Sequence, residues 1–153
     1  MVGVCFCFVE NAAAAKRVTE AIDKTSGGSG VFEFVFGGIG FDLRLYGGNV
    51  FVLFQPECDH CQEEAIQIEQ RLQEFRNYTL YFISSAPMEQ IDGFARNFGL
   101  HEKENVKFAW TSTQGVLDHY GPIPTPSVYV YADGRLRQSF KGQTPVDTIL
   151  KSL

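Results

Sequence analysis

The sequence predicts an α/β fold with a mixed central sheet and helices on both of its faces. From residue 49 onward, segments typical of strands and helices follow one another in the order β-α-β-α-β-α-β-β-α. The run 49–54 is apolar without alternation, which is typical of a central strand covered on both sides. The segment after it has a helical stripe of apolar residues, at spacings of three and four, formed by Ala65, Ile68, Leu72 and Phe75.

Length and charge limit the classes of protein that fit. The chain has 153 residues, enough for one domain with a sizeable core. Its formal net charge is −5 and it contains no cluster of Lys and Arg, so we expect no nucleic-acid partner. No apolar run approaches the roughly 18 residues of a membrane-spanning helix.

The first 30 residues (1–30) are predicted to be an N-terminal extension of unassigned role, and residues 31–153 the main domain. A strand over 2–9 and a helix over 11–24, with Asn11 as its N-cap, precede a glycine-rich segment at 26–30. Apolar residues 2–9 and the alanines after them faintly resemble a signal peptide. Basic leading residues are missing and Glu10 interrupts the run, which favours a mature or truncated domain start.

Two cysteines lie in this extension. In a strand, Cys5 and Cys7 would share one face. We interpret them as two small apolar residues, with a redox or metal-binding pair as the alternative.

The next two β-rich runs, 31–36 and 41–46, flank four residues that include three glycines, and so predict an N-terminal β-hairpin. The remaining strands are predicted at 49–54, 78–84, 106–110, 127–131 and 136–140, the last two around a turn at 132–135. The helices between them are predicted from the second cysteine pair to about Arg76, at 88–98 and at 113–120, and Gly99 closes the second of these. A final helix is predicted at 144–153, with Thr144 as N-cap and Pro145 at its first position.

The second cysteine pair, Cys58-Asp59-His60-Cys61, lies where a strand gives way to a helix. Two thiols separated by two residues can close a small disulfide ring and open it again. Unsatisfied N–H groups and the positive end of the dipole at a helix start favour the thiolate. This arrangement predicts thiol–disulfide exchange.

Four features in order resemble the thioredoxin superfamily: a strand leading into the Cys58–Cys61 motif, a helix that begins at the cysteines, Thr125-Pro126 leading into a strand, and a strand–turn–strand followed by Gly142 and a final helix. Within that superfamily the chain looks most like the TlpA/ResA-type thiol–disulfide proteins. The hairpin at 31–46, the added region 87–110 and a glutamate three residues after the second cysteine, Glu64, match that type.

The resemblance implies roles for individual residues. Cys58 would attack a disulfide, Cys61 would resolve the mixed disulfide, and Pro126 would be cis beside them, with Thr125 offering its backbone to an extended client. From the residues themselves, His60 as a cation would stabilise the thiolate of Cys58, or it faces solvent with little effect. Glu64 would exchange a proton with Cys61, or it is one acid of an exposed first turn.

Several alternatives remain open. The pair could be inert, or half of a structural zinc site, although no second pair completes four ligands. A peroxiredoxin-like peroxidase would normally have Thr or Ser where this chain has Gln55. A non-enzymatic binding module or thiol metal chaperone could add His101 or His119 as a ligand, but nothing in the sequence places them at the cysteines.

The predicted partners are protein thiols and disulfides and a second protein that reduces or oxidises the pair. No cofactor and no metal are expected. The TlpA/ResA resemblance implies a compartment outside the cytoplasm and a membrane electron donor, whereas the sequence itself shows no convincing export signal.

Overall fold

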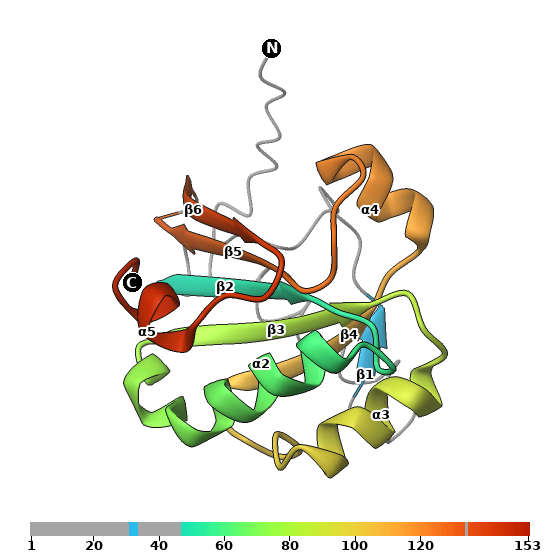
Figure 1. Cartoon of the computed structure of the whole chain (residues 1–153), viewed down its shortest axis with the longest axis horizontal. Coiled ribbons are helices and arrows are strands. Elements are labelled where there is room, and N and C mark those ends of the chain that lie inside the picture. Colours follow the sequence, from blue (N-terminus) through green and yellow to red (C-terminus); the bar gives the residue numbers. More distant parts are fainter. Residues whose placement is uncertain (1–30, 34–46, 134) are drawn as a thin grey trace, which may run out of the picture.

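The computed structural model describes residues 31–33, 47–133 and 135–153. Six strands form one sheet in the order β1-β4-β3-β2-β5-β6 (Figure 1). Their bounds are Val31–Glu33 for β1, Gly48–Leu53 for β2, Tyr78–Ser84 for β3, Val106–Trp110 for β4, Ser127–Ala132 for β5 and Arg135–Lys141 for β6.

β2 lies in the middle of the sheet, as its apolar sequence predicts. It pairs in parallel with β3 on one side and antiparallel with β5 on the other. All six of its residues are buried, which matches the lack of alternation in the run 49–54. At Gly48 there is room only for glycine, because a Cβ there would lie 2.1 Å from the ring of Tyr78.

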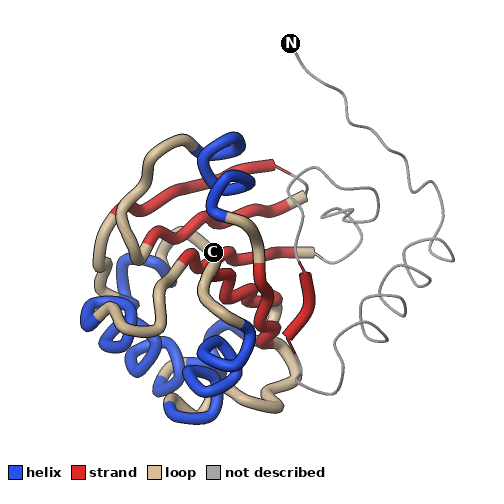
Figure 2. Tube along the Cα trace, turned by 90° about the vertical axis from the view of Figure 1, so that its right-hand side faces the viewer, coloured by secondary structure: helices blue, strands red, loops and turns tan. Residues whose placement is uncertain are grey.

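Helices cover both faces of this sheet (Figure 2). Side chains of α2 (Asp59–Gln70), α3 (Met88–Asn97) and α5 (Val146–Leu150) pack on the face formed by alternate residues such as Val50, Val52 and Phe82. Val116 and Tyr120 of α4 (Thr113–Tyr120) pack on the opposite face, against Phe51 and Tyr129 among others. The predicted fold class, a mixed sheet with helices on both faces, is therefore confirmed.

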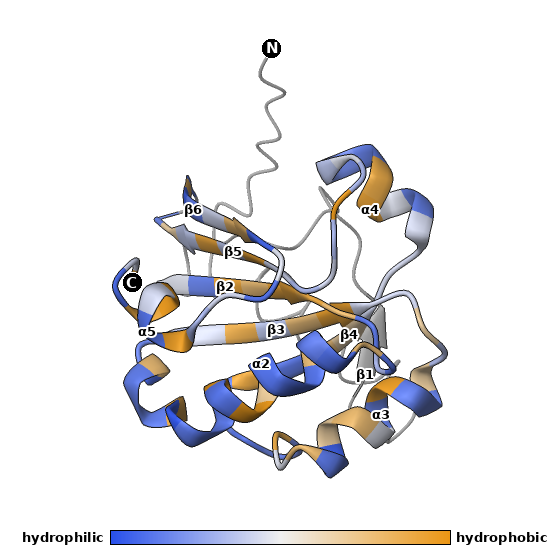
Figure 3. Cartoon of the chain, in the orientation of Figure 1, coloured by the Kyte–Doolittle hydropathy of each residue, from blue (hydrophilic) through white to orange (hydrophobic). Residues whose placement is uncertain are grey.

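Phe54 lies at the centre of an aromatic cluster on the α2 and α3 side. Its ring centroid is 4.5 Å from that of Phe94, 5.8 Å from that of Phe82 and 6.2 Å from that of Phe108. The apolar colouring of β2 and β3 in Figure 3 shows how this core continues along the middle of the sheet. The cluster fixes the strand end from which the cysteine motif begins.

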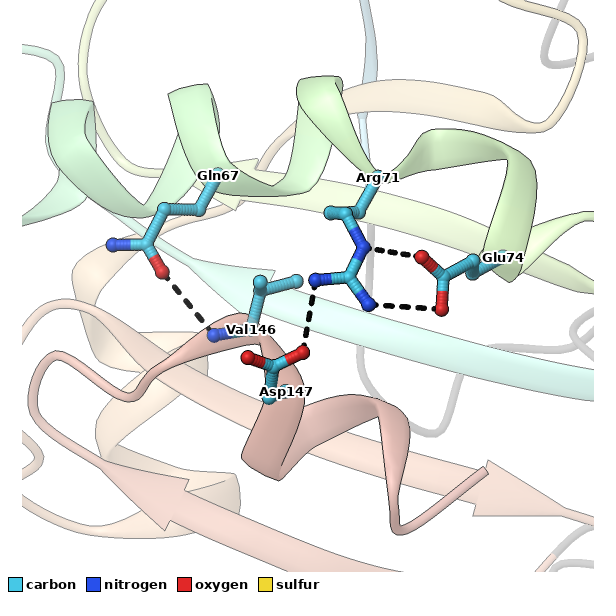
Figure 4. A network of polar contacts seen from close by, with 5 residues as sticks. All are labelled: Gln67, Arg71, Glu74, Val146 and Asp147. Atoms are coloured by element: carbon cyan, nitrogen blue, oxygen red, sulfur yellow. Dashed lines mark hydrogen bonds and ion pairs between the residues drawn. The ribbon is translucent and has the colours of Figure 1, made fainter.

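The prediction of one continuous helix to Arg76 is wrong. α2 ends at Gln70, and a short 3-10 helix, η1 (Leu72–Phe75), follows. The N–H of Arg71 donates to the carbonyl of Ile68, three residues back, which tightens the turn. The Arg71 guanidinium then bonds Glu74 and Asp147, so it ties the end of α2 to α5 (Figure 4).

The predicted start of the last helix is also wrong. α5 covers 146–150, and Pro145 is its N-cap, with an extended ψ of 135°. The N–H of Thr144 donates to the Glu64 carboxylate and that of Val146 to the Gln67 side chain. The Gln67 side chain, drawn in Figure 4, thus accepts the Val146 N–H, a donor that a Thr144 cap was expected to serve.

The N-terminal hairpin is not tested as a whole, because its second arm, 41–46, lies outside the described residues. The described part of the first arm, β1, pairs in parallel with β4. The hairpin prediction did not include this pairing. The extension 1–30, with Cys5 and Cys7, also lies outside the described residues. In the described part of the chain, no helix has the length and apolar character needed to cross a membrane.

Candidate active site

Cys58 is the N-cap of α2, at the carboxyl end of the central strand. Its backbone is extended, with φ −83° and ψ 115°, and its Sγ accepts the N–H of Cys61 at 3.2 Å. The carbonyl of Cys58 accepts the N–H of Gln62, the first bond of the helix. The sulfur is half-buried, and it receives a backbone donor at the positive end of the helix dipole, which suits a thiolate.

Cys61 is one turn into the helix and is only 2% exposed. Burial, together with the neighbouring Cys58 thiol, raises the pKa of the Cys61 thiol to about 12. Both cysteines are free thiols here. The two sulfurs therefore differ sharply: the Cys58 sulfur is half-buried and meets one backbone donor, the Cys61 N–H, whereas the Cys61 sulfur is buried and its pKa favours the protonated thiol.

The Thr125–Pro126 peptide bond is cis, as the resemblance implied. The thiol of Cys58 donates to the Thr125 carbonyl at 3.6 Å, so the loop before β5 lies directly against this half-buried sulfur. The Pro126 carbonyl accepts the N–H of Gly142 at 2.9 Å. Gly142 has φ +85°, a conformation that favours glycine, and it turns the chain from β6 back toward this loop.

Glu64 is buried, with 1% exposure, and does not belong to an exposed first turn. One carboxylate oxygen accepts the N–H of Thr144 at 2.9 Å, and the other has no hydrogen-bond partner among the described residues. Burial raises the pKa of Glu64 to about 7, although the Thr144 N–H opposes that shift. A carboxyl with this pKa can hold or release a proton near neutrality.

His60 is exposed on α2 and is held by side chains. Its Nδ1 lies 2.6 Å from Oε1 of Gln143, and Nε2 of that amide donates to Glu63 at 2.7 Å. Sequence analysis did not single out Gln143, which lies 83 residues from His60. The only local signal near it was Gly142, which marks where the chain turns before the last helix.

A pocket of about 270 Å³ adjoins the site, between α4 and the ends of β2 and β3. Its wall combines apolar residues such as Leu53, Ile83 and Leu117 with Thr125 and Gln55. The Gln55 side chain donates to Ser85 at 3.1 Å and accepts from Ser84 at 3.3 Å. Gln55 is therefore already hydrogen-bonded on both sides of its amide.

The structure brings some of the predicted site residues together and leaves others apart. Cys58, Cys61 and Thr125 are in mutual contact. Within the described residues, no group of three His, Cys, Asp or Glu side chains could hold a metal ion. The two candidate ligands do not join the cysteines there: His101 lies 3.8 Å from Glu102, and His119 packs edge-on against Tyr120.

No protein-family model matches the sequence. A search of curated proteins found no match either. The comparison with solved structures, in contrast, gave many matches at low sequence identity.

One similar structure is a secreted Mycobacterium tuberculosis disulfide oxidoreductase homologous to Escherichia coli DsbE. It superposes with a TM-score of 0.62 at 18% identity, and the match covers 83% of this chain and 97% of that one. StoA from Bacillus subtilis gives a TM-score of 0.55 at 11% identity, over 69% of this chain and 81% of that one. The peroxidoxin BcpB from M. tuberculosis gives 0.57 at 15% identity, over 72% and 80%.

These neighbours define the class of fold. The chain has the thioredoxin-like fold, and the fold expected from the cysteine motif and the Thr125-Pro126 segment is confirmed. Both disulfide oxidoreductases and peroxidoxins occur among the neighbours, so the fold by itself does not choose between their activities.

Proposed function

We propose that this protein is a TlpA/ResA-like thiol–disulfide oxidoreductase that exchanges disulfides with protein clients through Cys58 and Cys61. The observation that carries the proposal is the unequal pair at the start of α2. Cys58 is half-buried and receives an N–H at its sulfur, whereas Cys61 is buried with a raised pKa. The attacking thiol must be reachable and able to form a thiolate, whereas a buried thiol with a raised pKa does not react with clients directly.

In the reducing direction the exchange takes two steps. The Cys58 thiolate attacks one sulfur of a client disulfide, the client S–S bond breaks, and one client sulfur leaves as a thiolate that takes up a proton. Cys61 then loses its proton and attacks the Cys58 sulfur, which releases the second client thiol. The client gains two electrons and two protons, and the protein keeps a Cys58–Cys61 disulfide that a partner protein must reduce.

Two further residues have proposed roles at the same sulfurs. The Thr125 carbonyl, 3.6 Å from the Cys58 sulfur, would pair with the backbone of an extended client. Glu64, with its pKa raised to about 7, would accept the proton that Cys61 loses. Pro126 would act through its cis peptide bond with Thr125, which turns the Thr125 carbonyl toward the Cys58 sulfur.

The location outside the cytoplasm is part of this proposal. It is supported by the secreted M. tuberculosis disulfide oxidoreductase, whose fold this chain shares over 83% of its length. A membrane protein as electron donor follows from the TlpA/ResA resemblance alone.

Reduction of insulin by dithiothreitol, followed by turbidity, tests the proposal. The wild type should accelerate precipitation, and Cys58→Ser should lower the rate to that of dithiothreitol alone, because no attacking sulfur remains. A matched control, the double variant Cys5→Ser/Cys7→Ser, removes two thiols outside the proposed pair and should keep the wild-type rate. Full activity of Cys58→Ser would rule the proposal out.

Peroxide reduction is a second candidate, favoured by the peroxidoxin among the structural neighbours. Gln55 occupies the position of the usual Thr or Ser, and its amide already bonds Ser84 and Ser85. Stopped-flow measurement of peroxide consumption by the reduced protein decides between the two activities. Rapid stoichiometric consumption that depends on Cys58 would favour the peroxidase.

A further inference from the structure

Three consecutive residues, 142–144, join the two halves of the cysteine site by hydrogen bonds. The Gly142 N–H donates to the Pro126 carbonyl in the loop against Cys58. The Gln143 side chain bonds His60 and Glu63, and the Thr144 N–H donates to Glu64. The segment therefore contacts the Thr125-Pro126 loop on one side and the first two turns of α2 on the other.

The direction of the Gln143 amide is fixed by its two partners. A carboxylate can only accept, so the amide nitrogen must face Glu63 and the amide oxygen must face His60. That oxygen can only accept, so Nδ1 of His60 must carry a proton. The hydrogen-bond chain Glu63–Gln143–His60 thus holds the imidazole in one place and with Nδ1 protonated.

Hydrogen bonds indicate where the imidazole and the Cys58 sulfur are each held. Within α2, Glu63 and Glu64 lie three and four residues after His60, so the three side chains share the face that segment 142–144 covers. The Cys58 sulfur instead meets the Cys61 N–H at the helix start and the Thr125 carbonyl. Gln143 therefore holds the Nδ1 of the ring in a bond to its own amide and not to the Cys58 sulfur.

We propose that Gln143 is a positioning residue that keeps His60 away from Cys58 and thereby sets the equilibrium between the disulfide and the dithiol. The inference rests on the proposed function, since it concerns the same Cys58–Cys61 couple. A histidine free to swing toward the helix start would stabilise the Cys58 thiolate by charge and hydrogen bonding. Stabilising the thiolate favours the reduced form and makes the disulfide more oxidising.

Equilibration with reduced and oxidised glutathione measures this effect. The redox state is followed by the mass of the alkylated peptide that carries Cys58 and Cys61, so Cys5 and Cys7 do not contribute. We expect Gln143→Leu to shift the equilibrium constant toward the dithiol by threefold or more, which corresponds to about 14 mV. Gln138→Leu, the same substitution at an exposed position of β6, should match the wild type.

A double variant separates positioning from a general structural effect. His60→Ala alone should leave the equilibrium close to that of the wild type, because the ring is already held away. Gln143→Leu/His60→Ala should then match His60→Ala. Glu57 and Asp59 flank Cys58 in every variant, so their charges cancel in these comparisons. Gln143→Ala gives the same test if the leucine variant does not fold.

The tautomer of His60 gives an independent readout. Nitrogen-15 chemical shifts should show Nδ1 protonated in the wild type, and the ring should change toward the tautomer with Nε2 protonated in Gln143→Leu.

Each contrary result has a distinct meaning. An unchanged or opposite shift in Gln143→Leu, a shift that persists without His60, or an unprotonated Nδ1 in the wild type would overturn the positioning role alone. A wild-type pair that never equilibrates with glutathione would overturn the proposed function, and this role with it.

Discussion

Cys58 and Cys61 differ in what their sulfur atoms can reach. The Cys58 sulfur accepts the Cys61 N–H and lies against the Thr125 carbonyl, half-buried at the helix start. Cys61 is packed into the core with Val50, Phe54 and their neighbours. The difference follows from position: Cys58 lies at the helix N-cap, whereas Cys61 lies on the side of the first turn that packs into the core.

This difference predicts selective alkylation of the reduced protein. At neutral pH, iodoacetamide should modify Cys58 at least about a hundredfold faster than Cys61, since only a minute fraction of Cys61 is thiolate when its pKa is raised to about 12. Peptide mass spectrometry after short labelling times measures the two rates. Labelling at equal rates would show that Cys61 is neither buried nor protonated as described.

The residues of the site that sequence analysis identified are those with a local signature. Two cysteines at a strand–helix boundary, and a Thr-Pro before a strand, each predict their geometry from a few neighbouring residues. Gln143 has no such signature, because its partners lie 80 and 83 residues away and meet it only once α2 and the segment before α5 pack together. For the same reason the sequence left open whether Glu64 is buried or belongs to an exposed first turn.

At the scale of elements, one face of α2 is joined to the chain before and within α5 by polar contacts. In order along the helix, His60, Glu63, Glu64, Gln67 and Arg71 bond residues 143–147. The spacing of three and four residues places all five on one stripe. The more distant part of this contact, at Gln67 and Arg71, is drawn in Figure 4.

Within this contact, Glu64 makes stability depend on pH in a specific direction. Its pKa is raised by burial to about 7 in the folded protein, above the ordinary 4.5. The folded state therefore holds this proton more tightly than the unfolded chain does. The contribution of Glu64 to stability is greatest below about pH 4.5 and is lost as pH rises through 7.

Glu64→Gln removes this dependence while keeping an acceptor for Thr144. Its free energy of unfolding relative to the wild type should increase by about 2–3 kcal/mol between about pH 5 and pH 8. Urea unfolding at both pH values measures the change. Glu89→Gln, at an exposed position of α3, should show almost none, and parallel pH profiles for Glu64→Gln and wild type would contradict the raised pKa.

Sequence patterns placed these elements well but not their ends. Apolar periodicity continues past Gln70 into η1, so it could not reveal the 3-10 turn at Arg71. Likewise, Thr144-Pro145 has the local form of a helix start. The Val146 N–H that it was expected to cap is instead bonded to Gln67 of α2, and Glu64 of the same helix accepts the N–H of Thr144 itself, contacts that no local pattern contains.

At the scale of the whole molecule, the core on the α2 and α3 side depends on stacked and edge-on phenylalanines. Phe82 stacks on Phe108 at 5.1 Å, and Phe54 contacts both as well as Phe94. Phe54 directly follows β2, and the other rings come from β3, β4 and α3, so the cluster links the strand end that leads into the cysteine motif to the rest of the sheet.

Phe54→Ala should therefore lower the free energy of unfolding by about 3–5 kcal/mol, because it removes a ring with 1% exposure and leaves a cavity. Urea or thermal unfolding measures this loss. Leu136→Ala on β6 removes a side chain that is 50% exposed and should change stability by less than about 0.5 kcal/mol. Similar losses for the two variants would mean that the cluster does not support the core.

The order of the elements predicted a mixed sheet with β2 in its middle, and both points are confirmed. The parallel pairing of β1 with β4 was not predicted. Two strands so far apart in the chain can pair in several ways, and their residue patterns are compatible with each. A local hairpin signal offered the nearest partner, whereas the sheet edge beside β4 is formed only when the chain has folded.

The burial of the Cys61 sulfur beside the reachable Cys58 sulfur limits how many proteins can react at the proposed site at one time. Substrate and electron donor must approach the same atom, the sulfur of Cys58, from the same side. Client and electron donor cannot both react with this sulfur at once, so in the proposed cycle two half-reactions alternate and the two proteins compete for one site. A large excess of the client or of the electron donor would therefore lower the turnover rate, because it would keep the other protein from reaching the Cys58 sulfur.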